Sequence, residues 1–362
     1  MVLLGLLVLI GLIIFYSASL GLNIREDIGF VKILFSQVFF GIVLGGILLF
    51  ITAKIPLSLI NKYALHIFIF AFLSTFLVFI PGLGIEHGGA SRWIRIFGSS
   101  FQPSELLKIG SVIFFSAWIV GVKSKIQTIK FGLLPLLILM ILVTGALVLQ
   151  KDTGTLMVIL GTLLCMYFLV GGKVKYVLFI ILIGVLGLVT IYKLGDKIGY
   201  EHAQERIEVF LHPEKSDIQG EGYQIDQSLI AVGSGGFYGK GFGQSVQKFG
   251  FLPEPMGDSI FAVFSEEWGF AGGVVLIILF LLLTFRGFKI ALNTNNLFAF
   301  SLVSGIMLLV ILQSFVNIGA MIGIIPLTGI PLVFVSKGGT ALLIAIASMG
   351  VVLGASKGME NK

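Results

Sequence analysis

Charged residues are scarce in this chain of 362 residues. Asp, Glu, Lys and Arg together make up 12% of it, whereas 57% of the residues are hydrophobic and the mean hydropathy is +1.08. That charged fraction is about half of the share in an average soluble domain. Because so few charges cannot cover the surface of a soluble protein, the composition excludes that class and indicates that most of the chain lies in lipid.

Cysteine and histidine are also rare. The one cysteine, Cys165, lies in an apolar run, so neither a disulfide framework nor a thiolate metal site can be built from this chain. None of the four histidines has a second histidine four residues away, the spacing that places two ligands on one helical face. The net charge of +6 is spread over short loops and never forms a basic stripe with interleaved aromatics, which excludes nucleic-acid binding.

Long apolar runs recur from one end of the chain to the other. A helix needs about 20 mostly apolar residues to cross the hydrocarbon core of a bilayer. The runs predict an all-α polytopic membrane protein with about ten transmembrane helices, which we place at 1–20, 32–53, 59–80, 104–121, 132–149, 155–171, 176–194, 258–285, 297–323 and 340–356. Because nothing repeats at a fixed period, residues 1–362 are interpreted as a single transmembrane domain.

Lysine and arginine are distributed unequally between the two sides of this topology. With the N-terminus inside, the cytoplasmic segments hold Lys54, Lys62, Lys123, Lys125, Lys130, Lys173, Lys175, Arg286, Lys289, Lys357 and Lys362. The short outer loops hold fewer, namely Arg25, Arg92, Arg95, Lys151 and Lys337. Short cytoplasmic loops carry the positive excess, so both termini are expected in the cytoplasm. A cleavable signal peptide ending near Ser17 to Ser19 is the alternative for the first run, but no basic residue precedes it.

One connecting segment, residues 195–257 between the seventh and eighth predicted helices, is much longer than the others. We expect it to be a large extracytoplasmic loop, and long loops of this kind are usually functional. Its stretch from Glu201 to Leu211 is amphipathic and could rest on the membrane surface. Glycine makes up six of the eleven residues from Gly233 to Gly243. Such a stretch disfavours a helix and offers free N–H groups suited to phosphate, while a flexible connector is the alternative.

Ionisable side chains gather at the predicted outer ends of several helices. An ionisable group near the centre of a membrane costs about 2.5 to 3.5 kcal/mol on insertion, so each is a candidate for function. The candidates are Asp258, Glu266 and Glu267 at the eighth helix, Glu105 and Lys108 at the fourth, and Lys151 and Asp152 before the sixth. Together they predict a polar pocket that faces outward and suits an anionic headgroup whose lipid tail stays in the bilayer.

The carboxylates among these candidates allow more than one interpretation. Asp258 follows a stretch with two prolines and a glycine and precedes an apolar run, so it lies near a helix N-terminus, where capping is the alternative to chemistry. Glu266 and Glu267 lie two turns further in, and each is expected to pair with a cation from another helix. Glu105 and Lys108 are three residues apart on one helical face, where they brace the helix or hold a polar cavity open.

Several motifs, taken together, resemble one known family, the SEDS proteins (shape, elongation, division and sporulation). The matching stretches are Gly89-Ala-Ser-Arg-Trp-Ile94, Phe101-Gln-Pro-Ser-Glu105 with Lys108, Asp152-Thr-Gly-Thr155, Tyr223-Gln224 to Gln227-Ser228, Ala231-Val-Gly-Ser-Gly-Gly236, Leu252-Pro-Glu254 with Asp258, Phe261-Ala-Val263, Glu266-Glu267, and Asn317 through Gly339. The resemblance covers nearly the whole chain. It implies a ten-helix glycosyltransferase of the bacterial cytoplasmic (inner) membrane that joins lipid II units into glycan strands.

The resemblance also implies partners and a subtype. A class B penicillin-binding transpeptidase and other division proteins are the expected partners. Residues 243–248 ahead of Leu252-Pro-Glu254 are closer to the division type, FtsW, whereas Thr328-Gly-Ile-Pro331 is closer to the elongation type, RodA. We favour the division type. The chain departs from the family pattern at Met256-Gly257, where His-Thr is usual, at Lys151 in place of Pro, and at Val333 and Lys337 in place of Pro and Tyr. These changes put the local shape of the acceptor site in question.

By the same resemblance, Asp258 is the catalytic residue, a general base that takes the proton from the acceptor sugar as it displaces undecaprenyl pyrophosphate with inversion. The expected substrate-binding residues are Arg92, Trp93, Glu105, Lys108, Lys151, Asp152, Ser234, Gly235, Lys248, Glu254 and Lys337. A divalent cation, Mg²⁺ or Mn²⁺, could help to stabilise the leaving pyrophosphate. The alternatives are a lipid II flippase, an elongation-type polymerase and a non-catalytic scaffold.

Overall fold

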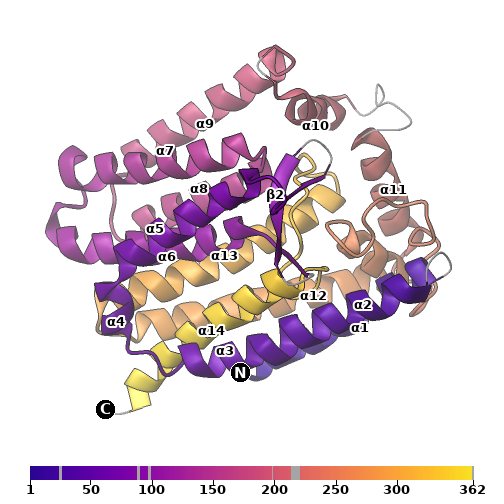
Figure 1. The fold of residues 1–362 in the computed structure, drawn as a ribbon, viewed down its shortest axis with the longest axis horizontal. Coiled ribbons are helices and arrows are strands. Elements are labelled where there is room, and N and C mark those ends of the chain that lie inside the picture. The colour runs from indigo at the N-terminus through magenta and orange to yellow at the C-terminus, as the bar shows by residue number, and fades with distance from the viewer. Residues whose placement is uncertain (24–26, 88–89, 97–98, 198, 213–220, 361–362) are drawn as a thin grey trace. The chain divides into compact units, whose positions relative to one another are not determined.

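The computed structural model describes residues 1–23, 27–87, 90–96, 99–197, 199–212 and 221–360 (Figure 1). Its helices are α1 (Val2–Asn23), α2 (Asp27–Ser36), α3 (Gly45–Thr52), α4 (Leu57–Lys62), α5 (Ala64–Ser74), α6 (Pro103–Val122), α7 (Leu134–Leu149), α8 (Thr153–Leu169), α9 (Val174–Leu194), α10 (Glu201–Leu211), α11 (Glu221–Ser234), α12 (Ile260–Leu292), α13 (Leu297–Met321) and α14 (Gly339–Glu360). Short π-helical turns cover Gln37–Leu44 and Ile129–Leu133, and 3₁₀ turns cover Thr75–Phe79 and Lys123–Lys125. Arg25, Gly89 and Lys362, which entered the sequence predictions, lie outside the described residues.

Eight helical segments among the described residues are long and apolar enough to cross a membrane. They are Val2–Gly21, Ile33–Thr52, Pro103–Lys125, Ile129–Leu149, Val174–Leu194, Ile260–Leu292, Leu297–Met321 and Gly339–Lys357. Two shorter apolar helices, Ala64–Phe79 and Thr153–Leu169, coincide with the third and sixth predicted spans. The predicted class, a helical multi-pass membrane protein, is confirmed. The count of ten spans stays a prediction, because the two shorter helices are at the lower limit of membrane thickness.

A small antiparallel sheet, which the sequence analysis did not expect, precedes α6. Its strands are β1 (Gly84–His87), β2 (Ala90–Ile96) and β3 (Ser99–Phe101), in the order β1-β2-β3. Gly84 pairs with Ile94, and Ile94 pairs with Phe101. Ile94 is 2% exposed and anchors the sheet in the core. The segment was interpreted as a loop because its short strands are too brief for hydrophobic alternation to stand out.

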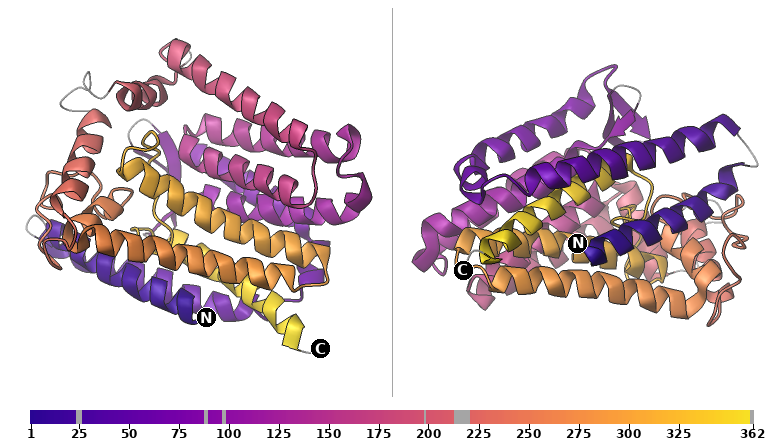
Figure 2. Two further views of the ribbon diagram at one scale, coloured as in Figure 1. Left: turned by 180° about the vertical axis from the view of Figure 1, so that it is seen from behind. Right: turned by 90° about the horizontal axis from the view of Figure 1, so that it is seen from below.

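The chain forms two compact units. Unit 1 consists of residues 1–39, 184–283 and 313–338, and unit 2 consists of residues 40–183, 284–312 and 339–362. In unit 1, α1 packs on α2, and α10 packs on α11. In unit 2, α14 lies along α3, α5 lies along α6, and α7 packs on α8 (Figures 1 and 2). Small residues allow the close approach of α5 to α6: a Cβ at Gly110 would lie 3.0 Å from that of Ala71.

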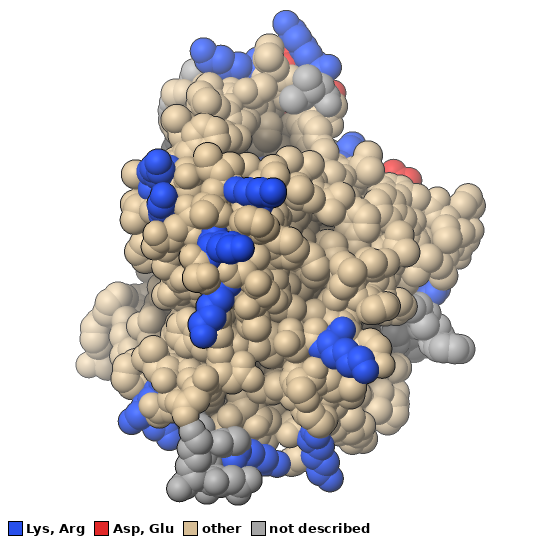
Figure 3. All heavy atoms as spheres, turned by 90° about the vertical axis from the view of Figure 1, so that its left-hand side faces the viewer, with Lys and Arg blue, Asp and Glu red and all other residues tan. Residues whose placement is uncertain are grey.

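In the view of Figure 3, several Lys and Arg side chains are seen at the surface, with few of Asp or Glu. In unit 2, the lysines of the loops predicted to be cytoplasmic are exposed: Lys54, Lys62, Lys123, Lys125, Lys130, Lys173 and Lys175. Loop charge therefore still predicts the side of the membrane on which these loops lie.

Candidate functional site

Asp258 lies at the end of a tight turn that leads into α12. The turn is closed by two backbone hydrogen bonds to the carbonyl of Glu254, from the N–H of Gly257 (2.9 Å) and from that of Ser259 (3.3 Å). Glu254 itself is exposed and has a positive φ of 45°, an uncommon conformation for a residue with a side chain. The prolines that flank Glu254 keep the helix from starting earlier, so Asp258 is left half-buried, two residues before Ile260.

Two amide side chains hold Asp258 in place. On α11, Gln224 donates from Nε2 to Asp258 Oδ2 at 3.2 Å and to Ser259 Oγ at 3.0 Å. On α13, Asn317 donates from Nδ2 to the Asp258 carbonyl at 2.7 Å and to the Ile330 carbonyl at 2.9 Å. The carboxylate and its backbone are thus bound from two different helices, which is the rigid support that a catalytic group requires.

A guanidinium group lies near the same carboxylate. A Cβ built on Gly329 would lie 3.9 Å from Asp258 Oδ2 and 3.7 Å from Nη2 of Arg206, a half-buried residue of α10. Gly329 has a φ of +67°, where glycine is strongly preferred. The cation and the carboxylate therefore both lie next to the backbone of Gly329.

Lys337 approaches this turn through its backbone. Its N–H donates to the Met256 carbonyl at 2.7 Å, and its side chain is exposed. The segment that follows α13 is therefore fastened two residues before Asp258. Among the cations predicted to bind substrate, Lys337 is thus a residue of unit 1 whose backbone lies near the predicted base and whose side chain is exposed.

Helix α12 is broken at Gly269, where φ is 65° and ψ is −167°. The glycine-rich loop after α11 pairs with the backbone groups around this break. The N–H groups of Lys240 and Gly241 donate to the carbonyls of Glu266 and Glu267, both at 3.0 Å. In the other direction, the N–H groups of Phe270 and Ala271 donate to the carbonyls of Gly236 and Phe237, at 2.9 and 3.1 Å. The break is tolerated in a membrane helix because these bonds replace the lost helical ones.

The same loop binds an anion, and that anion is a side chain of the protein. The Glu266 carboxylate accepts from the N–H groups of Val246 and Gln247, both at 3.2 Å, and from Ser245 Oγ at 2.6 Å. It also forms an ion pair with Lys240 at 2.6 Å. Of the predicted substrate-binding residues next to this loop, Ser234 is the last residue of α11 and donates to the Ala231 carbonyl at 3.1 Å. Gly235 packs against the backbone of Ser265 and Glu266.

Lys248, predicted to bind substrate, is deeply buried in an ion pair. Its Nζ lies 2.7 Å from Glu267 Oε1, and the side chains are 0% and 2% exposed. Ser17 of α1 completes the cluster, donating to Glu267 at 2.7 Å and accepting from Lys248 at 3.1 Å. Glu266 and Glu267 do pair with cations, as expected, but the expectation that these cations lie on another helix is wrong. Both cations come from the loop, which reaches α12 because it closes over the break at Gly269.

Unit 2 holds a separate set of the predicted residues. Glu105 and Lys108, one turn apart on α6, form an ion pair of 2.8 Å in which each side chain is 7% exposed. The buried Asp152 caps α8 by accepting from the Thr155 N–H at 3.2 Å. Asp152 also accepts from Gln102 Nε2 at 3.0 Å and from Ser104 Oγ at 3.1 Å, and thereby ties the start of α8 to the start of α6.

Three further candidates in unit 2 belong to the sheet and the turn before α8. Arg92, on β2, donates to the carbonyl of Lys151. Lys151 is exposed and has a positive φ of 56°, which places its carbonyl in a strained turn just before the Asp152 cap. Trp93 is opposite Ile85 in the sheet and is half-buried.

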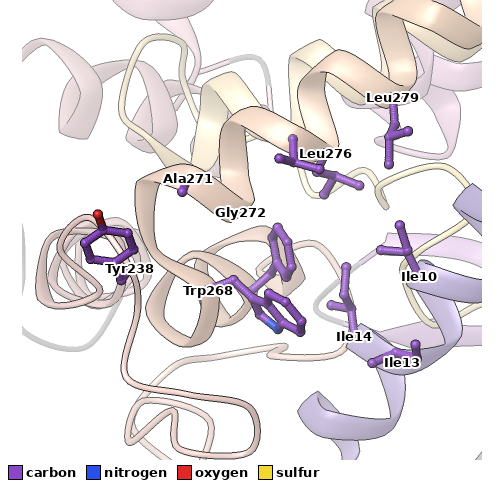
Figure 4. A pocket seen from close by; sticks show the side chains of 11 residues that line it. Ile10, Ile13, Ile14, Tyr238, Trp268, Ala271, Gly272, Leu276 and Leu279 are labelled. Carbon is purple, nitrogen blue, oxygen red and sulfur yellow. The ribbon is translucent and has the colours of Figure 1, made fainter.

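An apolar groove of about 410 Å³ lies between α1 and α12 within unit 1. Figure 4 shows Ile10 and Ile14 of α1 across the groove from Trp268 and Leu276 of α12. No Asp, Glu, Lys, Arg or His side chain lines it, so we leave it out of the polar chemistry around Asp258.

The described residues contain no group of three His, Cys, Asp or Glu side chains placed to hold a metal ion. They therefore do not form an all-protein metal cage. Mg²⁺ is commonly bound by one or two carboxylates together with phosphate oxygens of a substrate, and Asp258 is a carboxylate of the kind that such a site uses.

Three residues around Asp258 were not predicted from the sequence as site residues: Arg206, Gln224 and Asn317. Gln224 and Asn317 fell within motifs of the family resemblance, which was the available signal. Arg206 gave none, because it lies 52 residues before Asp258 in an amphipathic stretch that could equally rest on the membrane.

A protein-family model described as "Cell cycle protein" and covering FtsW, RodA and SpoVE matches residues 1–361. Stage V sporulation protein E of Bacillus subtilis (strain 168) is 36% identical over 353 residues, which are 97% of this chain and 94% of that protein. The probable peptidoglycan glycosyltransferase FtsW of Geobacter sp. (strain M18) is 36% identical over 301 residues, which are 83% of this chain and 80% of that protein. Its namesake in Coxiella burnetii is 34% identical over 360 residues, covering 98% of this chain and 94% of that protein.

Solved structures share the fold. One is described as "Structural coordination of polymerization and crosslinking by a peptidoglycan synthase complex". A chain of that structure superposes on this one with a TM-score of 0.79 at 24% identity, and the match covers 99% of this chain and 97% of that one. The rod shape determining protein RodA of Thermus thermophilus superposes with a TM-score of 0.68 at 24% identity, covering 98% of this chain and 94% of that one.

Proposed function

This chain belongs to the FtsW, RodA and SpoVE family of cell cycle proteins, and from that membership we propose that it polymerises lipid II into β-1,4 glycan strands. It is an enzyme, a glycosyltransferase of the multi-pass membrane type. The proposal places the reaction on the outer face of the cytoplasmic membrane, with both termini inside. The loop charges support that orientation.

The observation that carries the proposed mechanism is the fixed position of Asp258. Gln224 binds its carboxylate and Asn317 binds its backbone carbonyl, so the group is oriented before any substrate arrives. Asp258 acts as the general base, taking the proton of the acceptor sugar's 4-hydroxyl. That oxygen forms the new bond to the anomeric carbon of the donor as the bond to the pyrophosphate breaks on the opposite side. One displacement of this kind inverts the anomeric carbon and needs no covalent enzyme intermediate.

The leaving pyrophosphate needs positive charge, and two cations of unit 1 are placed to provide it. Arg206 shares the space over Gly329 with Asp258, and Lys337 is fastened beside Met256 with its side chain exposed. A guanidinium offers a pair of parallel N–H donors to phosphate oxygens. A divalent cation would bind mainly to the pyrophosphate oxygens with Asp258 as the protein ligand, and it would add Lewis-acid stabilisation of the leaving group.

The proposed biological role is cell division, with a class B penicillin-binding transpeptidase as the partner that crosslinks the strands. Support comes from the FtsW relatives and from the similar fold of a chain in a peptidoglycan synthase complex. A sporulation protein belongs to the same family, so family membership supports the glycosyltransferase chemistry more directly than it supports a role in division.

The test uses purified full-length protein and labelled lipid II, with and without the transpeptidase and Mg²⁺. Asp258→Asn keeps the shape of the side chain but removes the base, and we expect glycan formation to fall by about 10² to 10⁴-fold. Asp226→Asn, a change at an exposed acid on α11, is the matched control and should polymerise normally. A wild-type rate in Asp258→Asn would refute the assignment.

A vesicle assay separates the proposed polymerase from a flippase. Vesicles that contain only this chain should form glycan from lipid II supplied on the outer face. Movement of labelled lipid II across the bilayer without polymerisation would favour transport instead. The effect of EDTA on the first reaction tests the proposed cation.

A further inference from the structure

A second groove, of about 450 Å³, lies entirely within unit 2. It is formed by the end of α4, the start of α5, the last turns of α6 and the segment up to Phe131 that follows α6. Its lining divides into two parts. Leu65, Phe114 and Ala117 make an apolar wall, whereas Asn61, Lys62 and Lys125 supply polar atoms.

The groove lies at the end of a helix that is long and apolar enough to cross a membrane. Helix α6 is a membrane-crossing segment that ends at Val122, and the basic turn Lys123–Lys125 follows it directly. Trp118, one turn before the end of α6, lines the groove and donates from Nε1 to the Phe131 carbonyl at 3.0 Å. Tryptophan is enriched at this depth, where its ring lies in the boundary between lipid tails and headgroups.

The charge in the two segments that carry the polar lining of the groove has one sign. Residues 51–66 and 117–134 contain five lysines and no aspartate or glutamate. Lys125 and Lys130 both lie over the Phe131 ring, 5.0 and 5.5 Å from its centroid. In the part of the chain that the structure describes, Lys62 and Lys125 are exposed and take part in no ion pair with a carboxylate. The edge of the groove therefore presents uncompensated positive charge above an apolar wall.

We propose that this groove binds an anionic phospholipid. Its phosphate binds to Lys62 and Lys125 with Asn61 as a further donor, and one acyl chain lies along Leu65, Phe114 and Ala117. Basic pockets between transmembrane helices on the cytoplasmic side are the sites at which acidic headgroups bind. A free phosphate would leave the apolar wall exposed, so the lining as a whole fits a lipid.

Gly121 gives this proposal a steric test. It lines the groove, and a Cβ built on it meets nothing within 4 Å, so a larger side chain would extend into open space. Gly145 on α7 has the same open surroundings but does not line the groove. Replacing either glycine by leucine favours the helix, so the two variants differ mainly in whether the groove is filled.

The experiment measures quenching of Trp118 fluorescence by brominated lipids in the full-length protein. Trp93→Phe and Trp268→Phe remove the other two tryptophans, and the protein is titrated in mixed micelles with brominated phosphatidylglycerol or brominated phosphatidylcholine. Each lysine near an anionic headgroup gives about a fivefold preference, so the anionic lipid should quench at about 25-fold lower mole fraction. Lys62→Gln with Lys125→Gln should abolish that preference. The matched pair Lys173→Gln with Lys175→Gln, at exposed lysines outside the groove, should keep it.

Gly121→Leu should lose quenching by both lipids, and Gly145→Leu should behave as the parent. Equal quenching by the two lipids, or an unchanged preference in the Lys62 and Lys125 double variant, would overturn the proposal. Displacement of the lipid by water-soluble glycerol 3-phosphate at matched ionic strength would also overturn it, since the site would then be one for free phosphate. If the lysine variant does not stay monodisperse, the Gly121 and Gly145 pair still decides the question.

Discussion

The buried ion pair between Lys248 and Glu267 provides the sharpest test of how this structure is held together. Lys248 was expected to bind substrate, but its side chain is 0% exposed and lies 2.7 Å from Glu267. If the pair is structural, Glu267→Gln leaves a buried ammonium group without a countercharge. Removing one partner of a buried ion pair costs roughly 3 to 5 kcal/mol, whereas replacing both partners by neutral groups is often close to neutral.

The assay is thermal unfolding in detergent, in which fluorescence-detected size-exclusion chromatography measures the protein that stays folded at each temperature. We expect Glu267→Gln to lower the Tm by roughly 5–10 °C and the double variant Lys248→Met, Glu267→Gln to regain most of that loss. Lys240→Met is the comparison, and it should lower the Tm less than Glu267→Gln. The Lys240 side chain, in the neighbouring pair with Glu266, is 35% exposed, so solvent screens that pair. The double variant should also keep polymerase activity. If it regains stability but binds lipid II poorly, Lys248 contacts substrate and the structural interpretation is wrong.

Three further predictions concern single positions. Gly329→Ala adds a Cβ in contact with both Arg206 and Asp258 at a φ of +67°, so it should lose about 1 to 2 kcal/mol of stability and part of its activity. Gly323→Ala, at a φ of +72° beside Leu229, should lose stability alone, and equal activity in the two variants would contradict the site geometry. Gly269→Ala should unfold or express poorly, because its Cβ would lie 2.6 Å from the Phe237 carbonyl oxygen. Gly273→Ala is the control: the nearest atom to its Cβ would be 3.5 Å away, so its Tm should not change in the same thermal assay. Asp152→Ala removes the α8 cap and leaves the buried donors Gln102 and Ser104 without an acceptor, so it should lower the free energy of unfolding by roughly 2 to 4 kcal/mol. Asp152→Asn should lower it clearly less. A similar loss in both variants would show that the charge matters and not the hydrogen bonds.

The helices could be predicted because their signal is local. Each of the ten apolar runs falls on an apolar helix, and the amphipathic stretch from Glu201 to Leu211 coincides with α10. The pairing of Glu105 with Lys108 followed from their spacing on one helix turn. Hydropathy and helical periodicity depend only on neighbours along the chain, and so they can be read without knowledge of the fold.

The surroundings of Asp258 could not be predicted in the same way. Its supports come from positions 34 residues before it, Gln224, and 59 residues after it, Asn317. Whether an amphipathic helix rests on the membrane or turns a side chain such as Arg206 toward a carboxylate depends on tertiary packing. The break in α12 was equally hidden, since Gly269 stands in a run that hydropathy treats as one continuous span.

The glycine-rich loop shows how the fold changes a prediction about chemistry. Its density of glycines suggested free N–H groups for phosphate, but the break at Gly269 leaves backbone groups of α12 that need partners in a membrane protein. The N–H groups of Lys240 and Gly241 meet that need, and those of Val246 and Gln247 bind the Glu266 carboxylate. In the mechanism we propose, recognition of the pyrophosphate in unit 1 would then fall to side chains. The Arg206 guanidinium and the Asp258 carboxylate both lie close to Gly329, and the backbone of Lys337 is bonded to Met256, two residues before Asp258. Replacing Arg206 or Lys337 should therefore weaken donor binding more than any change in the loop glycines that leaves the helix break intact.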